Sequence, residues 1–145
     1  LGVLAWGLRF RQLMAITATP LERWPSVALI VPCYLPNEEA IVMETVRHMC
    51  AKVEYPGAIR LVVVYNTPRP CAVQAELHAL HELHGVSVQA HHVRGSSSKA
   101  HNLEYALTIV DEEVVVLFDA DHQPCADCVT KLVTTLQRLP HVSAV

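Results

Sequence analysis

The sequence predicts an α/β fold in which a mostly parallel sheet carries helices on both faces. Short apolar segments rich in β-branched residues alternate with segments of helical periodicity, and each pair of apolar segments is separated by enough residues for a crossover helix. The composition, with 52% hydrophobic and 17% charged residues, excludes a disordered chain. A length of 145 residues suits one domain with a real core.

The first half of the predicted domain contains two strands and two helices. Strands are predicted over 27–32 and 60–65, where apolar residues run without interruption. The helix between them is predicted to begin at Asn37, a good N-cap, and the carboxylates of Glu38 and Glu39 favour its positive end. Four apolar residues then keep helical spacing: Val42, Val46, Met49 and Val53. A second helix is predicted over 72–84, with Gly85 as its stop.

The second half continues the alternation. A strand is predicted over 86–93, and a helix follows the serine run 96–98 with an apolar stripe formed by Ala100, Leu103, Ala106, Leu107 and Val110. Residues 114–118 predict a strand covered on both faces. A fourth helix carries its apolar residues at Val129, Leu132, Val133, Leu136 and Leu139, and 141–145 resembles a further strand cut off soon after its start.

The chain divides into an N-terminal helix or linker, residues 1–25, and a partial domain, residues 26–145. Arg9 and Arg11 interrupt the apolar start, so nothing reaches the roughly 20 apolar residues of a membrane span. Two interpretations of residues 1–14 stay open: the tail of a membrane or interfacial helix with Trp6 at the interface, or a surface helix. Five scattered cysteines favour reduced thiols and a cytosolic setting. The absence of an initial methionine suggests a fragment.

The candidate site lies where the predicted strands end. Asp119 and Asp121 follow five apolar residues, and because a carboxylate is costly to bury, both should leave the core at the carboxyl end of the strand. In a parallel sheet the loops after all strands meet at this edge, which is where α/β proteins bind ligands. Those loops also carry four further polar or aromatic candidates: Tyr34, Glu38, Asn66 and Lys99.

These side chains suit a nucleotide diphosphate bound with Mg²⁺ or Mn²⁺. Hard cations prefer carboxylate and phosphate oxygens, with Asp121 as the expected direct ligand and Asp119 as a second ligand or a ribose contact. Lys99 at a helix start would neutralise the phosphates. Tyr34 would stack on a base, and Glu38 or Asn66 would bond its edge. A net charge of −3 and a pI near 6.3 argue against nucleic acid as a partner.

Four segments resemble the family 2 inverting glycosyltransferases of the GT-A fold, and are similar to their cellulose, chitin and hyaluronan synthase branch. The segments are VALIVPCYLPNEEA, LVVVYN, SSKAHNLEYAL and VVVLFDADHQP. The third and fourth supply Lys99, Asn102 and a DxD motif at Asp119-Ala120-Asp121, which His122 and Pro124 follow. The first supplies a Pro-x-Tyr-Asn-Glu-like segment at Pro32, Tyr34, Asn37 and Glu38, with a short insertion.

The resemblance implies a Rossmann-like fold, truncated at its C-terminus, that binds the donor. It implies inverting transfer of a sugar from a nucleotide donor, with UDP as the expected nucleotide, to a glycan or lipid-linked acceptor, with Mg²⁺ or Mn²⁺ assisting. It also implies a membrane-bound parent with this domain on the cytoplasmic side. The implied donor-binding residues are Pro32, Tyr34, Glu38, Asn66, Lys99, Asn102 and Asp119, and Asp121 and Asp119 hold the metal. The acceptor base and a QxxRW-type motif, which lie downstream in the family, do not occur before Val145, so the catalytic base is unknown and the fragment alone should be inactive.

One departure from the family concerns Asn66, which stands where an aspartate usually contacts uracil and leaves base preference open. Two other classes compete with the transferase. PCADC at 124–128 is half of a zinc deaminase signature, although the upstream partner would be His101 and Glu104 at the wrong spacing. The second competing class is a non-catalytic nucleotide-binding module. HALHELHG lacks the zinc protease spacing, and RGSSSK lacks the second glycine of a phosphate-binding loop.

Overall fold

A computed structural model describes residues 21–139, 141 and 143–145. Its centre is a five-stranded sheet in the order β3-β4-β2-β1-β5, in which all neighbours are parallel except β3 and β4. The strands are β1 (Val27–Tyr34), β2 (Ile59–Asn66), β3 (Glu82–Leu83), β4 (Val86–His92) and β5 (Val114–Leu117). The predicted parallel α/β sheet is therefore confirmed, with one short antiparallel strand added.

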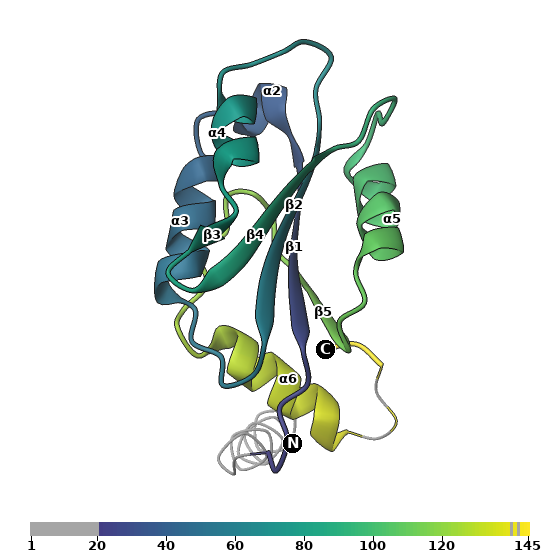
Figure 1. Ribbon diagram of the computed structural model, residues 1–145. Coiled ribbons are helices and arrows are strands. Elements are labelled where there is room, and N and C mark those ends of the chain that lie inside the picture. The colour runs from purple at the N-terminus through teal and green to yellow at the C-terminus, as the bar shows by residue number, and fades with distance from the viewer. Residues whose placement is uncertain (1–20, 140, 142) are drawn as a thin grey trace, which may run out of the picture.

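Helices cover both faces of the sheet (Figure 1). They are α2 (Leu35–Glu38), α3 (Val42–Lys52), α4 (Val73–Ala79), α5 (Lys99–Ile109) and α6 (Cys128–Arg138). Buried residues of α3, α4 and α6 pack in one cluster with one face of β1 and β2, whereas Ala106 of α5 packs with the other face. This two-sided cover explains why β1 and β2 consist of nearly continuous apolar residues.

The two central strands divide their side chains between the two clusters in strict alternation. Leu29 and Val31 of β1 point into the cluster under α3, α4 and α6, whereas Ala28 and Ile30 point toward α5. All four side chains are buried. Because β1 and β2 pair from Val27↔Ile59 to Tyr34↔Asn66, they end side by side at the edge that carries the candidate site.

The helix predicted over 72–84 ends at Ala79, and the histidine-rich stretch behind it forms a β-hairpin instead. Leu83 pairs with Val86 across a two-residue turn in which His84 and Gly85 both have positive φ, at 53° and 79°. Such a turn matches the twist of a hairpin. Gly85 is thus a hairpin residue rather than a helix stop. Of the histidines in HALHELHG, which are His78, His81 and His84, only His78 lies on a helix.

The predicted N-cap at Asn37 is also wrong. Pro36 occupies the first turn of α2, where its fixed φ favours helix, so this short helix begins at Leu35 and contains Asn37. A separate helix, α3, begins at Val42 after Ile41. Val53, predicted to face the core from this helix, is its C-cap in extended conformation.

At the other end of the sheet, the predicted cover of β5 on both faces holds for most of the strand. Val114 and Val116 are buried in the cluster with α3, α4 and α6, and Val115 packs against the cluster with α5, whereas Leu117 is 50% exposed. β5 pairs with β1, and no further strand lies beyond it in the part of the chain that the structure describes. Described residues 141 and 143–145 form no strand, contrary to prediction. The two interpretations of residues 1–14 lie outside the described residues. Within those described, no helix is long and apolar enough to cross a membrane.

Candidate functional site

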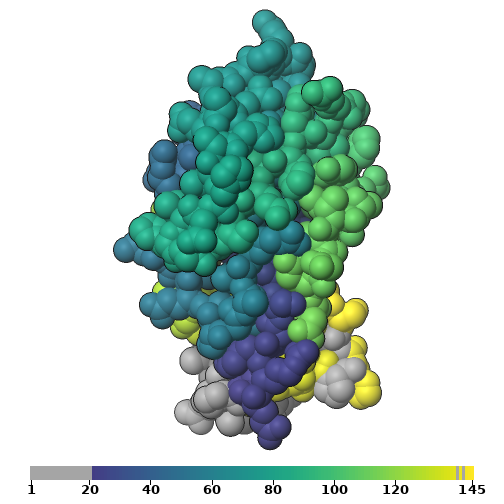
Figure 2. Space-filling view, viewed as in Figure 1, coloured from purple at the N-terminus to yellow at the C-terminus, as the bar shows by residue number. Residues whose placement is uncertain are grey.

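The site forms where β1, β2, β4 and β5 end. In Figure 1 the strands β1 and β2 run upward to the end of the molecule that carries α2 and the loop after β2, and α5 begins near the same end. The space-filling view shows the teal segments of the chain lying directly beside the green segment around α5 there (Figure 2). The sheet topology thus brings together loops that are distant in sequence, as predicted.

Lys99 connects two of these loops. Its Nζ lies 2.6 Å from a carboxylate oxygen of Glu38 and 3.3 Å from Oδ1 of Asp119. The other oxygen of Glu38 accepts a hydrogen bond from the backbone N–H of Tyr34 at 2.6 Å, which fixes the carboxylate at the end of β1. The pKa of Lys99 is raised chiefly by its hydrogen bond to Glu38, so the lysine is charged at neutral pH.

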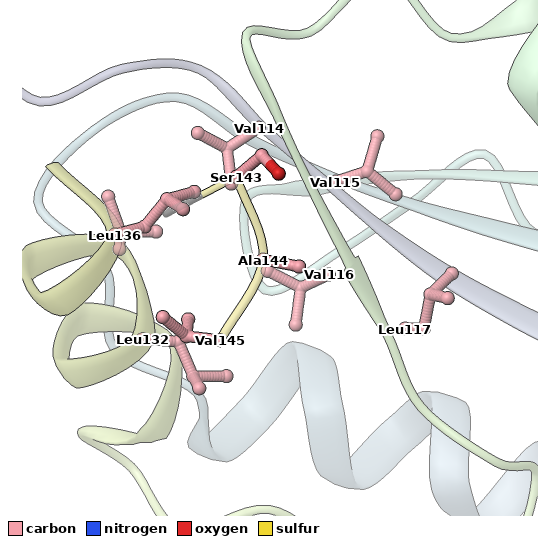
Figure 3. Close-up of a pocket in the computed structure, with 10 residues that line it drawn as sticks. Val114, Val115, Val116, Leu117, Leu132, Leu136, Ser143, Ala144 and Val145 are labelled. Carbon is pink, nitrogen blue, oxygen red and sulfur yellow. The ribbon is translucent and has the colours of Figure 1, made fainter. Parts of the chain in front are cut away.

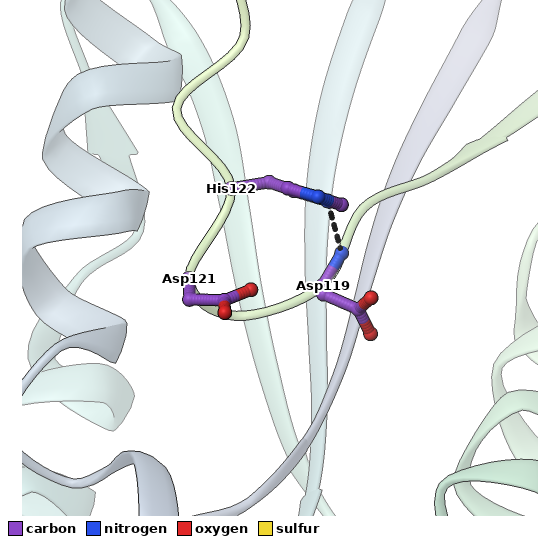
Figure 4. A group of neighbouring side chains, drawn as sticks. All are labelled: Asp119, Asp121 and His122. Carbon is purple, nitrogen blue, oxygen red and sulfur yellow. Dashed lines mark hydrogen bonds between the residues drawn. The ribbon is translucent and has the colours of Figure 1, made fainter.

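Asp119, Asp121 and His122 form a compact ligand set (Figure 4). One potential ligand atom from each residue lies within 4.8 Å of the others, and all three side chains are exposed. Two carboxylates and an imidazole have the donor chemistry that Mn²⁺ or Mg²⁺ accepts. The residues therefore fit a divalent cation, and no other group of this kind occurs in the described part of the chain.

His122 is the member of this set that sequence reasoning assigned no ligand role. It lies in a tight turn, because its backbone N–H donates to the carbonyl of Asp119 at 3.0 Å. Its Nδ1 accepts from the N–H of Asp119 at 3.2 Å. The signal in the sequence was the spacing D-x-D-H directly after a strand, which places all three side chains on one turn.

A cavity of about 240 Å³ lies beside this turn. Its lining includes the predicted site residues Pro32, Lys99 and Asp119, together with His122. Phe118 and Leu103 supply the apolar part of the wall. The cavity therefore combines a cationic side chain and a carboxylate with apolar lining residues. This arrangement suits a ligand that has both a charged part and a larger uncharged part.

A second cavity, of about 440 Å³, lies at the ends of β1 and β2. It is lined by Tyr34 and Asn66, which the sequence predicted to contact a base, and by the loop residues Thr67, Pro68, Gly95, Ser96 and Ser97. Tyr34 is half-buried. Asn66 is only 4% exposed and uses its amide within the protein, donating to the Ser96 carbonyl at 3.1 Å.

Asn102 lies beneath this cavity rather than in it. Its side chain is fully buried, and its Nδ2 donates to the carbonyl of Cys33 at 3.0 Å and to Oδ1 of Asn66 at 2.8 Å. Its Oδ1 is buried without a hydrogen-bond donor. Asn102 thus ties α5 to the ends of β1 and β2, and we find no surface through which it contacts a ligand directly.

The competing zinc interpretation finds no support. Cys125 is exposed and donates to the carboxylate of Asp127 at 3.3 Å, and Cys128 is the first residue of α6. Neither cysteine belongs to a group of potential metal ligands among the described residues. Burial is the main cause that raises the pKa of the Cys128 thiol. His78, from the other histidine-rich motif, hydrogen-bonds the Tyr65 hydroxyl at 2.7 Å.

A further cavity, of about 250 Å³, lies on the outer edge of the sheet between β5 and α6 (Figure 3). It is lined by apolar side chains of β5 and α6 and by 143–145. Ser143 is the only lining residue with a polar side chain, and none of the lining side chains is titratable. This cavity has no chemistry to contribute to a reaction.

The fold and the site together define an α/β domain with a polar ligand-binding edge at its strand ends. A family description, "Glycosyltransferase like family 2", matches residues 25–145, and the chain belongs to this family. Two curated relatives, putative cellulose synthases 2 and 3 of Komagataeibacter xylinus, are each 29% identical to it over 121 residues, which are 83% of the chain. The predicted family and the predicted class of enzyme, a glycosyltransferase, are thereby confirmed.

A solved structure shows the same fold. It is the mannosyltransferase PcManGT from Pyrobaculum calidifontis in complex with GDP-Man and Mn²⁺, with a TM-score of 0.60 and 23% identity. The match covers 91% of this chain and 40% of that one. The chain also spans only 7% of the length of the two curated relatives.

Proposed function

We propose that this domain binds the donor of a glycosyltransferase: a nucleotide-diphosphate sugar, with a divalent cation. The observation that carries the proposal is Lys99, held between Glu38 and Asp119 at the margin of the Asp119–Asp121–His122 ligand set. One cation beside a set of metal ligands is the charge pattern that a metal-bound diphosphate requires. The solved neighbour, which carries GDP-Man and Mn²⁺, supports the same class of ligand.

In this proposal the donor occupies both cavities, with a different part of the molecule in each. The base enters the cavity lined by Tyr34 and Asn66, where the Tyr34 ring provides a stacking surface. The diphosphate and sugar occupy the smaller cavity beside Lys99 and Asp119. Pro32, near the end of β1, is one of the residues that line that cavity. Asn102 acts from below, by holding the strand ends that carry these residues.

Asp121 and Asp119 would hold the cation, with His122 as an additional ligand. A divalent cation bound there would stabilise the negative charge that grows on the leaving diphosphate. Lys99 contributes a second positive charge to the same phosphates, and its bonds to Glu38 and Asp119 keep its side chain in place before the donor arrives. UDP is the expected nucleotide and inversion the expected stereochemistry, both from the family resemblance.

Acceptor chemistry belongs to the full-length protein in this proposal. We propose a glycan or lipid-linked acceptor, a membrane-associated parent with this domain on the cytoplasmic side, and a domain that starts near residue 26. The base that activates the acceptor is expected outside these 145 residues. The putative cellulose synthases among the relatives support a polysaccharide product.

The deciding experiment compares Asp121→Ala with the wild type in the full-length protein. Asp121→Ala should abolish manganese-dependent UDP binding in isothermal titration calorimetry, because it removes a carboxylate from the ligand set. Asp127→Ala is the control, since Asp127 is also exposed but pairs with Lys131. Unchanged UDP affinity in Asp121→Ala would refute the metal site. Tight UDP binding without sugar transfer by the wild type would favour a non-catalytic nucleotide-binding module.

A further inference from the structure

One face of α3 is bonded to the segment that carries the two exposed aspartates. The hydroxyl of Thr45 donates a hydrogen bond to the backbone carbonyl of Ala120 at 2.5 Å. One turn further along α3, Nε2 of His48 lies 2.9 Å from the carbonyl of Pro124, and since a carbonyl only accepts, this nitrogen is the donor. The helix thus fixes the 119–124 segment at two backbone positions.

The first of these two bonds is buried. Thr45 is 2% exposed and Ala120 is fully buried, although both neighbours of Ala120 are exposed. Water therefore cannot replace the hydroxyl if it is removed, and a buried carbonyl without a donor is costly. The bond holds the middle residue of the Asp119-Ala120-Asp121 triplet inward, which leaves both carboxylates on the solvent side.

Thr45 uses its hydroxyl differently from Thr134 and Thr135 of α6, although Thr130 of the same helix also donates to a distant carbonyl, that of Glu54. Thr134 and Thr135 donate to the carbonyls of Thr130 and Lys131, four residues back in their own helix, which is the common local pattern. Thr45 instead reaches a carbonyl in the loop between β5 and α6, 75 positions away in sequence. Its hydroxyl therefore connects two parts of the fold rather than satisfying its own helix.

We propose that Thr45, with His48, is a positioning residue for the donor-site carboxylates. It acts through the backbone of Ala120 and sets how closely Asp119, Asp121 and His122 approach one another before a cation binds. This inference rests on the proposed function for its effect on metal binding. The positioning itself is a property of the protein alone, and it is tested separately.

Thr45→Val keeps the shape of the side chain and removes the hydroxyl. In the full-length protein we expect it to weaken Mn²⁺ binding about ten-fold, measured by electron paramagnetic resonance of free Mn²⁺, because the loss of one buried hydrogen bond loosens the ligand set. Thr45→Ser restores the donor and should restore most of the affinity. Equal Mn²⁺ affinity in Thr45→Val and wild type would overturn the proposal.

Thr134→Val is the matched control, because Thr134 is equally buried in a helix but bonds only its own helix. It should leave Mn²⁺ affinity unchanged, and a similar loss in both variants would show a general effect of stability and overturn the proposal. If Thr45→Val does not fold, His48→Leu and His48→Gln test the second bond. Only the leucine variant, which has no donor, should then bind Mn²⁺ more weakly.

Backbone amide exchange separates this inference from the proposed function. The N–H groups of Asp119 and His122 are both bonded within the turn, so they report its order without any ligand. In metal-free protein, Thr45→Val should exchange these two amides several-fold faster than Thr134→Val does. If wild-type protein binds no Mn²⁺, the proposed function fails, and unchanged exchange in Thr45→Val would then also refute the positioning role.

Discussion

The Nζ of Lys99 and the carboxylate of Glu38 lie 2.6 Å apart, which joins the start of α5 to the end of α2 across the ligand-binding edge. Glu38 is largely buried and Lys99 is partly exposed, so the pair presents its positive member to solvent. Asp119 lies on the other side of the same lysine at 3.3 Å. The ammonium group is thereby held at the position where the proposed diphosphate needs a cation.

Lys99→Met should separate nucleotide binding from metal binding. We expect UDP affinity to fall at least ten-fold, because the diphosphate loses its cation, while Mn²⁺ alone binds as tightly as in wild type or more tightly, because a nearby positive charge is gone. Calorimetry with UDP and with GDP, each with Mn²⁺, gives the first quantity. Electron paramagnetic resonance gives the second.

Lys131→Met is the control for Lys99→Met. Lys131 also forms an ion pair with an aspartate, Asp127, at 2.6 Å, but this pair is exposed on α6. Lys131→Met should therefore change neither the affinity for UDP nor the affinity for Mn²⁺. Parallel losses of UDP and Mn²⁺ binding in Lys99→Met would mean that the lysine supports the structure of the site rather than the phosphates.

Asn66→Asp should destabilise the protein, even though it introduces the residue that the family resemblance leads us to expect at this position. Asn66 accepts from Asn102 and donates to the Ser96 carbonyl, and an aspartate cannot donate when ionised. We expect the free energy of unfolding to fall by about 2 kcal/mol at pH 8. The difference should shrink at pH 4, where the protonated acid can donate again. Urea denaturation at both pH values measures it, and a constant difference would contradict this account.

The Arg60 and Glu112 ion pair should make stability fall in acid. Arg60 lowers the pKa of Glu112 below its ordinary value of 4.5, chiefly through their hydrogen bonds, and both side chains are mostly buried. A carboxyl group with a lowered pKa stabilises the fold above its ordinary pKa, and that contribution is lost as the pH falls through the folded value. Glu112→Gln should therefore cost about 3 kcal/mol at pH 7 and less at pH 3, measured by urea denaturation.

Arg23 and Glu113 provide a contrast for this prediction. They also form a close ion pair, with Nη2 and Oε1 at 2.6 Å, but both side chains are exposed. Solvent screens such a pair, so Glu113→Gln should cost less than about 1 kcal/mol at any pH. If both glutamine variants showed the same pH dependence, burial would not be the reason for the larger effect at Glu112.

The sequence was sufficient to predict the parallel sheet, because β1 and β2 are apolar on both faces and only such a sheet buries both. It also placed Asp119 and Asp121 at a strand end, since burial of a carboxylate is costly. Thr45 and His48 escaped prediction, because a threonine and a histidine on an amphipathic helix carry no sign of a distant carbonyl partner. Asn102 was predicted to bind the donor, but its contacts with Cys33 and Asn66 exist only in the folded chain.

The hairpin shows a second limit of sequence reasoning. HALHELHG has the spacing of a helix followed by a glycine stop, and the same glycine also fits a two-residue hairpin turn. The choice between them depends on β4, which offers β3 a pairing edge on the side away from β2. A local pattern contains no information about that edge.

Gly85→Ala tests the hairpin directly. Gly85 has φ of +79°, and a Cβ added there would meet no atom within 4 Å, so the alanine is strained by its backbone conformation alone. We expect a loss of about 1 kcal/mol in the free energy of unfolding. His84→Gly, at the neighbouring position with φ of 53°, should relieve the same kind of strain and raise stability slightly. Urea denaturation of both variants shows whether each substitution lowers or raises the free energy of unfolding. If the segment were instead a helix ending at Gly85, His84→Gly would destabilise the protein, because glycine is a poor helix former.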